Sequence, residues 1–293
     1  MSLKDVRFNI VGKRKIWYCI SLVIIIAGLV SFFVQGFNTG IDFTGGSILQ
    51  LTFEKEVAVG ELRSTVSDLV EHTPLIQESE GSNTFNIRTD LTTDDEVNEL
   101  LAAIESSHGA YTIDRNEMVG PTIGKELTLN AFLALLIACA LMLVYITIRF
   151  QLRFGIASII TLVHDALILL SVFSIFQLEI SSSFIAAILT VIGYSINATI
   201  VIFDRVRENK PTYHADRIDD LVNDSVNQTL ARSVNTVITT LLTLFALFFF
   251  GGETTRVFVL ALIVGIAAGG YSSVFLSGSV YRDLCVHFGN KKK

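Results

Sequence analysis

The chain has 293 residues, of which 51% are hydrophobic and only 17% are charged, with a formal net charge of −6. A soluble protein typically carries about 25% charged residues, so this composition argues against a soluble domain and favours a membrane protein. The charge is unevenly spread: residues 37–126 hold 17 acidic and 5 basic residues, whereas the rest holds 11 acidic and 17 basic. An acidic, polar segment is therefore enclosed by apolar, mildly basic sequence.

Six apolar stretches are long enough to cross a bilayer as helices, which takes about 20 residues at a rise of about 1.5 Å each. They are Ile16–Val34, Leu127–Ile148, Phe154–Phe176, Phe184–Phe203, Val234–Phe250 and Val257–Val280. The first is too long for a typical signal-peptide core, so we expect a retained anchor over residues 16–36. Segments on the side of residues 1–15 hold 16 of the 22 basic residues, which predicts that both termini are cytoplasmic.

The segment after the first span, residues 37–126, is predicted to form one domain outside the membrane. Its expected elements are a strand at Ser47–Phe53, a helix at Val59–Val70, a hairpin of Leu75–Glu78 and Thr84–Thr89 turning at Gly81–Asn83, a helix from Thr92 or Thr93 to His108–Gly109, and a strand at Ala110–Asp114. The order β-α-β-β-α-β suggests a ferredoxin-like α+β domain. Its scattered carboxylates and its two histidines, His72 and His108, favour contact with another polypeptide over catalysis.

Residues 127–293 are predicted to form a region of five further membrane helices with a basic C-terminal tail. Between the fourth and fifth spans, residues 204–233 form a cytoplasmic segment. Apolar residues from Ile218 to Thr229 share one face there, which predicts an amphipathic helix lying along the inner membrane interface. In the last span, Gly265 and Gly269 are four residues apart, a spacing typical of close helix packing.

Polar residues inside the spans are costly and mark functional sites by default. His164 and Asp165 lie halfway along the third span, and Asp165 shares with Ser158 and Thr161 a polar face directed into the helix bundle. The pair either serves an ion path or forms a buried hydrogen bond that joins helices. Asn197 in the fourth span has the same two interpretations. Arg232, just before the fifth span, would by composition be an ordinary cytoplasmic anchor.

The sequence carries no phosphate-binding glycine loop, hydrolase triad or metal-ligand cluster. We therefore expect a protein that is not an enzyme and that holds no cofactor or metal. Any work that it performs would draw on a partner's nucleotide cycle or on an ion gradient.

Short motifs are spread in order over nearly the whole chain. They are Gly40–Gly46, Val119–Gly124, His164–Asp165, Val191–Asn197, Phe203–Asn209, Gln228–Ser233 and Gly251–Gly252. Taken together, they resemble the SecF branch of the SecD/SecF family of protein-export membrane proteins, within the resistance-nodulation-division (RND) superfamily. The signature positions that this resemblance assigns are Asp42, Gly45, Gly46, Gly193, Tyr194, Asp204 and Arg205. Gly45 and Gly46 would let the chain turn tightly into the first exterior strand.

The resemblance implies a function and a set of partners. RND transporters use twelve spans and proton flow, so six spans would be half of a bundle that SecD completes. Flow of H⁺, or of Na⁺, would drive motions of the exterior domains, which promote export of an unfolded secretory polypeptide from the SecYEG channel after the SecA motor. The implied location is the bacterial plasma (inner) membrane, in contact with its lipids and with no nucleic acid.

One position departs from the family pattern. SecF proteins usually carry an aspartate after the asparagine that corresponds to Asn197, and the family assigns that aspartate to a proton relay. Here the position is Ala198, which cannot titrate. The remaining relay candidates are Arg232, which matches the family's relay arginine, together with Asp165, Asn197 and His164. Either SecD's own aspartate carries the proton, which we prefer, or Asp165 takes over part of the role, or coupling is weakened.

Two other functions are weighed against this one. A small-molecule or lipid exporter of the RND superfamily would have twelve spans in one chain, so the count of six argues against it. A scaffold that uses no energy and only holds a SecD-like partner to the channel is kept open by Ala198.

Overall fold

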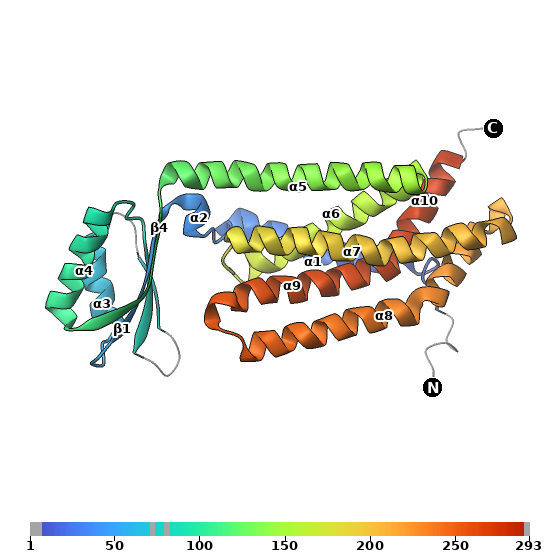
Figure 1. Ribbon diagram of the computed structural model, residues 1–293. Helices are drawn as coiled ribbons and strands as arrows, with labels where there is room; N and C mark the ends of the chain where they lie inside the picture. The colour runs from blue at the N-terminus through green and yellow to red at the C-terminus, as the bar shows by residue number, and fades with distance from the viewer. Residues whose placement is uncertain (1–7, 71–73, 79–82, 290–293) are drawn as a thin grey trace. The chain divides into compact units, whose positions relative to one another are not determined.

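The computed structural model describes residues 8–70, 74–78 and 83–289, and these divide into two compact units (Figure 1). The helical unit comprises the chain up to Asn38 and from Leu133 onward. The sheet unit comprises Thr39–Phe132. Each unit has its own hydrophobic core, and each is described by itself.

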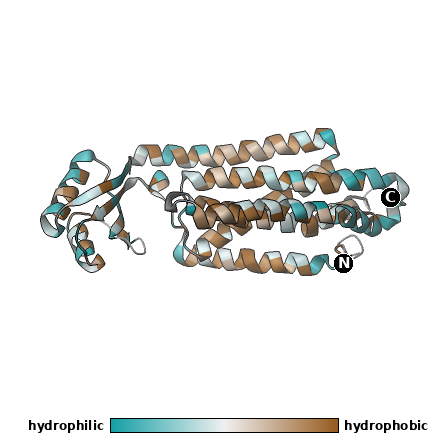
Figure 2. Cartoon of the chain, turned by 60° about the horizontal axis from the view of Figure 1, so that its bottom comes forward, coloured by the Kyte–Doolittle hydropathy of each residue, from teal (hydrophilic) through white to brown (hydrophobic). Residues whose placement is uncertain are grey.

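The described residues contain six helical stretches that are long and apolar enough to cross a membrane, as predicted. The helices are α1 (Arg14–Gln35), α5 (Pro121–Arg149), α6 (Leu152–Ile175), α7 (Ser182–Asn209), α8 (Ile218–Phe250) and α9 (Glu253–Ser272), and α9 continues through a π-helical turn (Ser273–Ser277) into α10 (Gly278–Gly289). Hydrophobic residues dominate the middle of these helices, and hydrophilic ones gather near their ends (Figure 2). This is the pattern that a bilayer requires.

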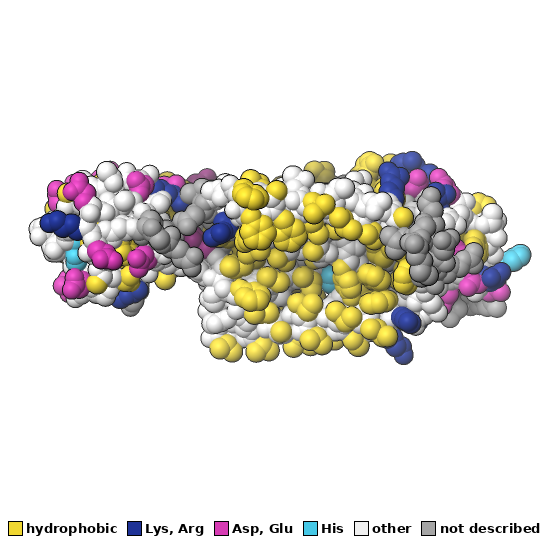
Figure 3. Space-filling model, turned by 90° about the horizontal axis from the view of Figure 1, so that it is seen from below, with side chains coloured by type: hydrophobic (Ala, Val, Ile, Leu, Met, Phe, Trp, Pro, Cys, Tyr) yellow, Lys and Arg dark blue, Asp and Glu magenta, His cyan; other side chains and the backbone are white. Residues whose placement is uncertain are grey.

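Three helices form the centre of the helical unit. In their most apolar windows, 50% of α6, 39% of α7 and 61% of the α9–α10 stretch is buried, against 11%, 6% and 6% for α1, α5 and α8. Large hydrophobic side chains of the outer helices are exposed, and one face of the unit is covered with them (Figure 3). Such a surface faces either lipid or the helices of another protein.

Glycines let the central helices approach one another closely. A Cβ added at Gly265 would lie 2.3 Å from the Val191 side chain, and one added at Gly269 would lie 2.9 Å from the Ser195 side chain. These two glycines of α9 therefore pack directly on α7, and the close packing predicted from their spacing is confirmed.

The helix predicted between Ile218 and Thr229 forms, but it is not a separate interfacial element. The chain leaves α7 through two short 3₁₀ turns, Lys210–Thr212 and Ala215–Arg217, and α8 then runs for 33 residues without a break. No proline or glycine lies between its first residue, Ile218, and its last, Phe250, so nothing in the sequence interrupts the backbone ladder. The apolar face of its first turns packs inside the protein: Val222 and Val226 are buried and meet Gly278 of α10.

The sheet unit holds a short helix α2 (Ile41–Thr44), strands β1 (Gly46–Phe53), β2 (Leu75–Glu78), β3 (Thr84–Thr89) and β4 (Tyr111–Val119), and helices α3 (Val59–Ser67) and α4 (Asp94–His108). The strands form one sheet in the order β2-β3-β1-β4, with every neighbouring pair antiparallel. Inward side chains of β1, β3, α3 and α4 make its core, among them Leu49, Leu51, Leu62, Phe85, Leu100 and Ile104. The small antiparallel sheet and its helices thus follow the expected sequence of elements.

Two element boundaries in the sheet unit differ from the prediction. The last strand extends to Val119, five residues beyond the predicted end at Asp114, because β4 pairs with β1 along its whole length and Gly46 lies opposite Val119. Helix α3 ends at Ser67 rather than at Val70. His72 and most of the expected hairpin turn at Gly81–Asn83 lie outside the described residues.

The glycine pair before β1 makes the tight turn that was expected. Gly45 has φ 78° and Gly46 has φ 125°, conformations that residues with a Cβ rarely adopt. A Cβ at Gly46 would also lie 2.3 Å from the carbonyl oxygen of Thr89 on the neighbouring strand. Asp42, in the first turn of α2, is half-buried directly before this turn.

Helix α4 begins at the predicted position. The Thr93 hydroxyl accepts a hydrogen bond from the Glu96 backbone N–H, and the Glu96 carboxylate accepts one from the Thr93 N–H at 3.1 Å. This is a capping box, which satisfies backbone donors that a helix start leaves free. Hydrogen bonds from the Thr93 side chain and the Thr92 backbone lower the pKa of Glu96. At the other end of α4, His108 lies 2.9 Å from the Thr65 hydroxyl and joins α4 to α3, which fits a structural role.

Candidate functional site

The polar residues of the spans form two separate groups in the helical unit. The first is centred on Asp165 of α6, whose side chain is completely buried. Ser195 of α7 and Ser272 of α9 both donate hydrogen bonds to its Oδ2 atom, at 2.5 Å and 2.8 Å. His164 Nδ1 lies 2.9 Å from the Oδ1 atom. Both carboxyl oxygens therefore have partners within the chain.

His164 extends this group to a further helix. Its Nε2 atom lies 2.9 Å from the hydroxyl of Ser21 on α1, so one chain of hydrogen bonds connects α1, α6, α7 and α9. The ring of Tyr271 lies next to His164, and its hydroxyl donates a hydrogen bond to the Trp17 carbonyl oxygen at 2.8 Å. We call Ser21, His164, Asp165, Ser195 and Ser272 the Asp165 cluster. It lies beside a hollow of about 370 Å³ whose other walls are mainly apolar.

Close packing is what brings the Asp165 cluster together. Ser195 faces Gly269, and Ser272 follows Gly269 by about one helical turn on α9. Since Gly269 has no side chain, α9 approaches α7 closely enough for both serines to reach one carboxyl oxygen. Chemically, the cluster can hold or pass a proton along hydroxyl, imidazole and carboxyl groups, and it also joins four helices in the low-dielectric interior.

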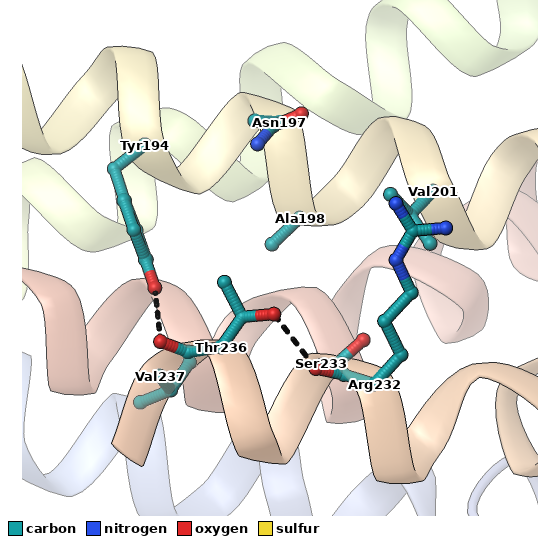
Figure 4. A pocket seen from close by; sticks show the side chains of 8 residues that line it. All are labelled: Tyr194, Asn197, Ala198, Val201, Arg232, Ser233, Thr236 and Val237. Atoms are coloured by element: carbon teal, nitrogen blue, oxygen red, sulfur yellow. Dashed lines mark hydrogen bonds between the residues drawn. The ribbon is translucent and has the colours of Figure 1, made fainter. Parts of the chain in front are cut away.

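The second group lies between α7 and α8 and contains Arg232. A hollow of about 90 Å³ is lined by Tyr194, Asn197, Ala198, Val201, Arg232, Ser233, Thr236 and Val237 (Figure 4). We call it the Arg232 hollow. Figure 4 shows the Ala198 methyl pointing from α7 toward α8, while the Arg232 side chain reaches from α8 toward Val201 of α7. Tyr194 crosses between the helices, and its hydroxyl donates to the Thr236 carbonyl oxygen at 3.0 Å.

The guanidinium of Arg232 forms no ion pair with the residues that the structure describes. Within the described ranges of the chain it also has no hydrogen-bond partner, and its side chain is exposed. The carboxylates that line a neighbouring hollow of about 320 Å³ with it belong to pairs on α7: Asp204 with Arg207 at 3.2 Å, and Glu208 with Arg205 at 2.9 Å. Because Ala198 carries no carboxyl group, the opposite wall of the Arg232 hollow offers no acid either.

The structure thus separates the relay candidates that the sequence grouped together. His164 and Asp165 belong to the Asp165 cluster, whereas Asn197, Ala198 and Arg232 belong to the Arg232 hollow. Helix α7 serves both: its buried face presents Ser195 to Asp165, and the other side presents Asn197, which is exposed. Gly193 is also exposed, and a Cβ there would meet nothing within 4 Å.

Sequence reasoning missed the hydroxyl partners of Asp165. Ser195 lies inside a recognised motif, but nothing in the sequence distinguishes it, Ser21 or Ser272 from the other serines of the spans. Only helix packing decides which serine reaches a carboxyl group.

Comparison with known proteins gives consistent matches. Residues 99–286 match the family model described as protein export membrane protein SecD/SecF, C-terminal, and residues 30–57 match the SecD/SecF GG motif. The protein translocase subunit SecF of Sebaldella termitidis is 42% identical over 92% of this chain and 89% of its own length. That of Acidaminococcus fermentans is 44% identical over 94% of this chain and 96% of its own length.

Solved structures give the same picture. The crystal structure of SecDF, a translocon-associated membrane protein from Thermus thermophilus, superposes with a TM-score of 0.86 at 38% identity and covers 99% of this chain. A structure of SecDF in a super-membrane-facing form gives a TM-score of 0.72 at 36% identity. This chain spans 40% of the length of each of those solved chains.

Proposed function

We propose a function that starts from the family: this chain belongs to the SecF branch of the SecD/SecF family of protein-export membrane proteins. It is a multi-pass membrane protein and a translocase subunit of the Sec export system. Beyond this, the proposal is that the chain and SecD together use an ion gradient, of H⁺ or Na⁺, to promote translocation of unfolded secretory polypeptides. We also propose that both termini lie in the cytoplasm of a bacterial cell. The sheet unit would then lie outside the membrane, and we assign it to the ferredoxin-like class.

The unpaired Arg232 is the observation that carries the proposal. A cation at the end of a membrane span is stable when a partner or water meets its charge. Further along the same helix, Asn235 is also exposed, although α8 is one of the least buried spans. The exposed threonines nearby, Thr236, Thr239 and Thr243, donate their hydroxyls to carbonyl oxygens of α8 itself and need no partner. Polar side chains on an outer membrane helix are best accommodated against another protein, because lipid offers them no hydrogen bonds. We therefore assign the α7–α8 surface around the Arg232 hollow to contact with SecD.

The same surface suggests which carboxylate takes part in ion transfer. Asp165 already has partners for both oxygens inside the chain, and it lies in the other polar group. Ala198, at the position where the family carries its aspartate, lines the Arg232 hollow but cannot titrate. A carboxylate of SecD facing Arg232 would complete an acid–base pair there, so we prefer it to Asp165 as the ion carrier.

The test is secretion by reconstituted vesicles that contain this chain, its SecD partner and the channel with its motor. With an ion gradient imposed, secretion should exceed that of vesicles in which an ionophore has collapsed the gradient. Arg232→Ala should lose this difference, whereas Arg149→Ala, an exposed arginine at the end of α5, should keep it. Secretion that is unchanged by collapse of the gradient would refute the coupling and leave the scaffold function.

A second variant tests the missing aspartate. Ala198→Asp places a carboxyl group on the wall of the Arg232 hollow. If the absence of a carboxyl group at Ala198 only weakens the proton relay in this chain, gradient-dependent secretion should rise in this variant. No gain, together with loss of secretion in Asp165→Asn at normal expression, would show that the path runs through Asp165 instead.

A further inference from the structure

A polar hollow at one end of the helical unit has no role in the proposed coupling. Its volume is about 870 Å³, and it is bounded by the start of α6, the connection from α7 to α8 and the last turns of α10. We propose that this hollow binds the phosphate-bearing headgroup of an anionic phospholipid. The proposal does not depend on the ion-coupling function.

Unpaired positive charge lines the hollow. Two of its arginines are neutralised inside the chain, Arg217 by Asp220 at 2.8 Å and Arg282 by Asp219 at 2.5 Å. Arg153 and Lys210, in contrast, have no hydrogen-bond or ion-pair partner among the residues that the structure describes. They come from different elements, the first turn of α6 and the residue that follows α7, and both line the same space.

Two further features bear on this charge. The α6 N-terminus adds positive potential, because backbone N–H groups are exposed at a helix start and its N-cap residue, Gln151, makes no side-chain capping bond. Asp216 acts in the opposite direction, since this exposed lining carboxylate also lacks a partner in the described part of the chain. The two unpaired cations outweigh it, so an anion is favoured.

The rest of the lining favours a lipid over a free anion. Tyr281 of α10 lines the hollow, and its largely buried ring stacks on Phe154 of α6, with ring centroids 4.0 Å apart. Leu221 and Val286 add apolar surface to the same hollow. Both cations lie at ends of membrane-spanning helices, the depth at which lipid headgroups meet the protein. A phospholipid can thus place its phosphate between Arg153 and Lys210 and its glycerol and upper chain against the apolar part.

The hollow is also held in a fixed shape. Arg282 binds both oxygens of Asp219, through Nε at 2.5 Å and Nη2 at 3.2 Å, which ties α10 to the first turn of α8. On the neighbouring side, Asp283 accepts a hydrogen bond from Tyr18 and pairs with Arg14, which ties α10 to α1. A site formed before the ligand arrives loses less entropy on binding.

The experiment titrates the purified full-length chain with phosphatidylglycerol and counts bound lipid by native mass spectrometry, with phosphatidylcholine as the neutral lipid. Arg153→Gln and Lys210→Gln should each weaken the tightest phosphatidylglycerol binding about fivefold, the factor for about 1 kcal/mol per basic residue at an anionic surface. Asp216→Asn should strengthen it. Arg149→Gln removes a charge four residues from Arg153 but outside the hollow, and should leave binding unchanged.

The results separate the possible sources of binding. Equal losses in Arg153→Gln and Arg149→Gln would overturn the proposal, because binding would then follow surface charge alone. Displacement of the lipid by inorganic phosphate at equal affinity would overturn the assignment to a lipid. All four altered side chains are exposed, so matching thermal unfolding of the variants and the parent chain should exclude misfolding as the cause.

Discussion

The Asp165 cluster and the Arg232 hollow are both polar sites among membrane-spanning helices, but they differ in whether their charged groups have partners within the chain. Asp165 is completely buried, and every oxygen of its carboxyl group meets a donor or an imidazole from the same chain. Arg232 is exposed at the surface of the unit, and its guanidinium has no hydrogen-bond or ion-pair partner within the described ranges. The first site is complete within the chain, and the second is open, as the proposed contact with SecD requires.

This difference separates stability from assembly. A polar cluster whose members lie on four helices of one chain contributes to the fold of that chain. A charged group without partners contributes little to the isolated chain, and its contribution appears when another protein supplies the missing charge. Variants of the Asp165 cluster should therefore lower the stability of the isolated chain, whereas a variant of Arg232 should affect assembly.

The largest loss of stability is expected for Asp165→Ala. It removes the acceptor shared by Ser195 and Ser272 and leaves the buried Ser195 hydroxyl unpaired, which should lower the free energy of unfolding by about 3 kcal/mol. Asp165→Asn keeps the shape and one acceptor oxygen and should cost about 1 kcal/mol. Reversible unfolding in mixed micelles measures both values. A cost below that of an ordinary surface substitution would show that the cluster does not hold the helices together.

A somewhat smaller loss is expected for Gly269→Leu. The new side chain would overlap Ser195 and force α9 away from α7, at a cost of about 2 kcal/mol. Gly265→Leu is the matched control, because it meets Val191 on the same pair of helices but touches no member of the Asp165 cluster. Combined with Asp165→Asn, the cost of Gly269→Leu should shrink, whereas that of Gly265→Leu should add in full. Equal additivity would contradict a link between close packing and the cluster.

Removing one hydroxyl should have a modest effect. Ser272→Ala deletes a single interhelical hydrogen bond and should cost about 0.6 kcal/mol, the average for such bonds in a membrane. Ser277→Ala, whose hydroxyl bonds to the backbone of its own helical stretch, gives the comparison with a bond that joins no helices. The same unfolding measurement applies, and a loss in Ser272→Ala as large as that in Asp165→Ala would mean that one serine carries the whole cluster.

The smallest effect on stability is expected for Arg232→Ala. Because the guanidinium has no partner in the described chain, its removal should change the unfolding free energy by less than about 0.5 kcal/mol. Its effect should appear in assembly, as reduced co-purification with SecD, and Arg232→Lys should restore part of it. Destabilisation of the isolated chain as large as that of Asp165→Ala would erase the contrast between the two sites.

Much of the fold could be predicted because it depends on local patterns. The six spans follow from apolar length, the start of α4 follows from the Thr93–Glu96 spacing, and β2 and β3 follow from alternation over a few residues. The interfacial position of the helix after the fourth span was predicted wrongly for the same reason. An apolar face at Leu221, Val222 and Val226 is equally suited to a membrane surface and to another helix, and only the packing of α10 against it decides between them.

The sequence by itself determined the six apolar spans, the glycine turn before β1 and the candidate residues of an ion path, since each depends on the chemistry of residues near in sequence. Tertiary structure alone decided that those residues form two sites. Asp165 and Asn197 both lie in polar stretches of apolar spans, and nothing local distinguishes them. Helix packing places Ser195 and Ser272 against Asp165 and leaves Arg232 open on the outer surface, because a helix presents residues only two positions apart, such as Ser195 and Asn197, to different neighbours.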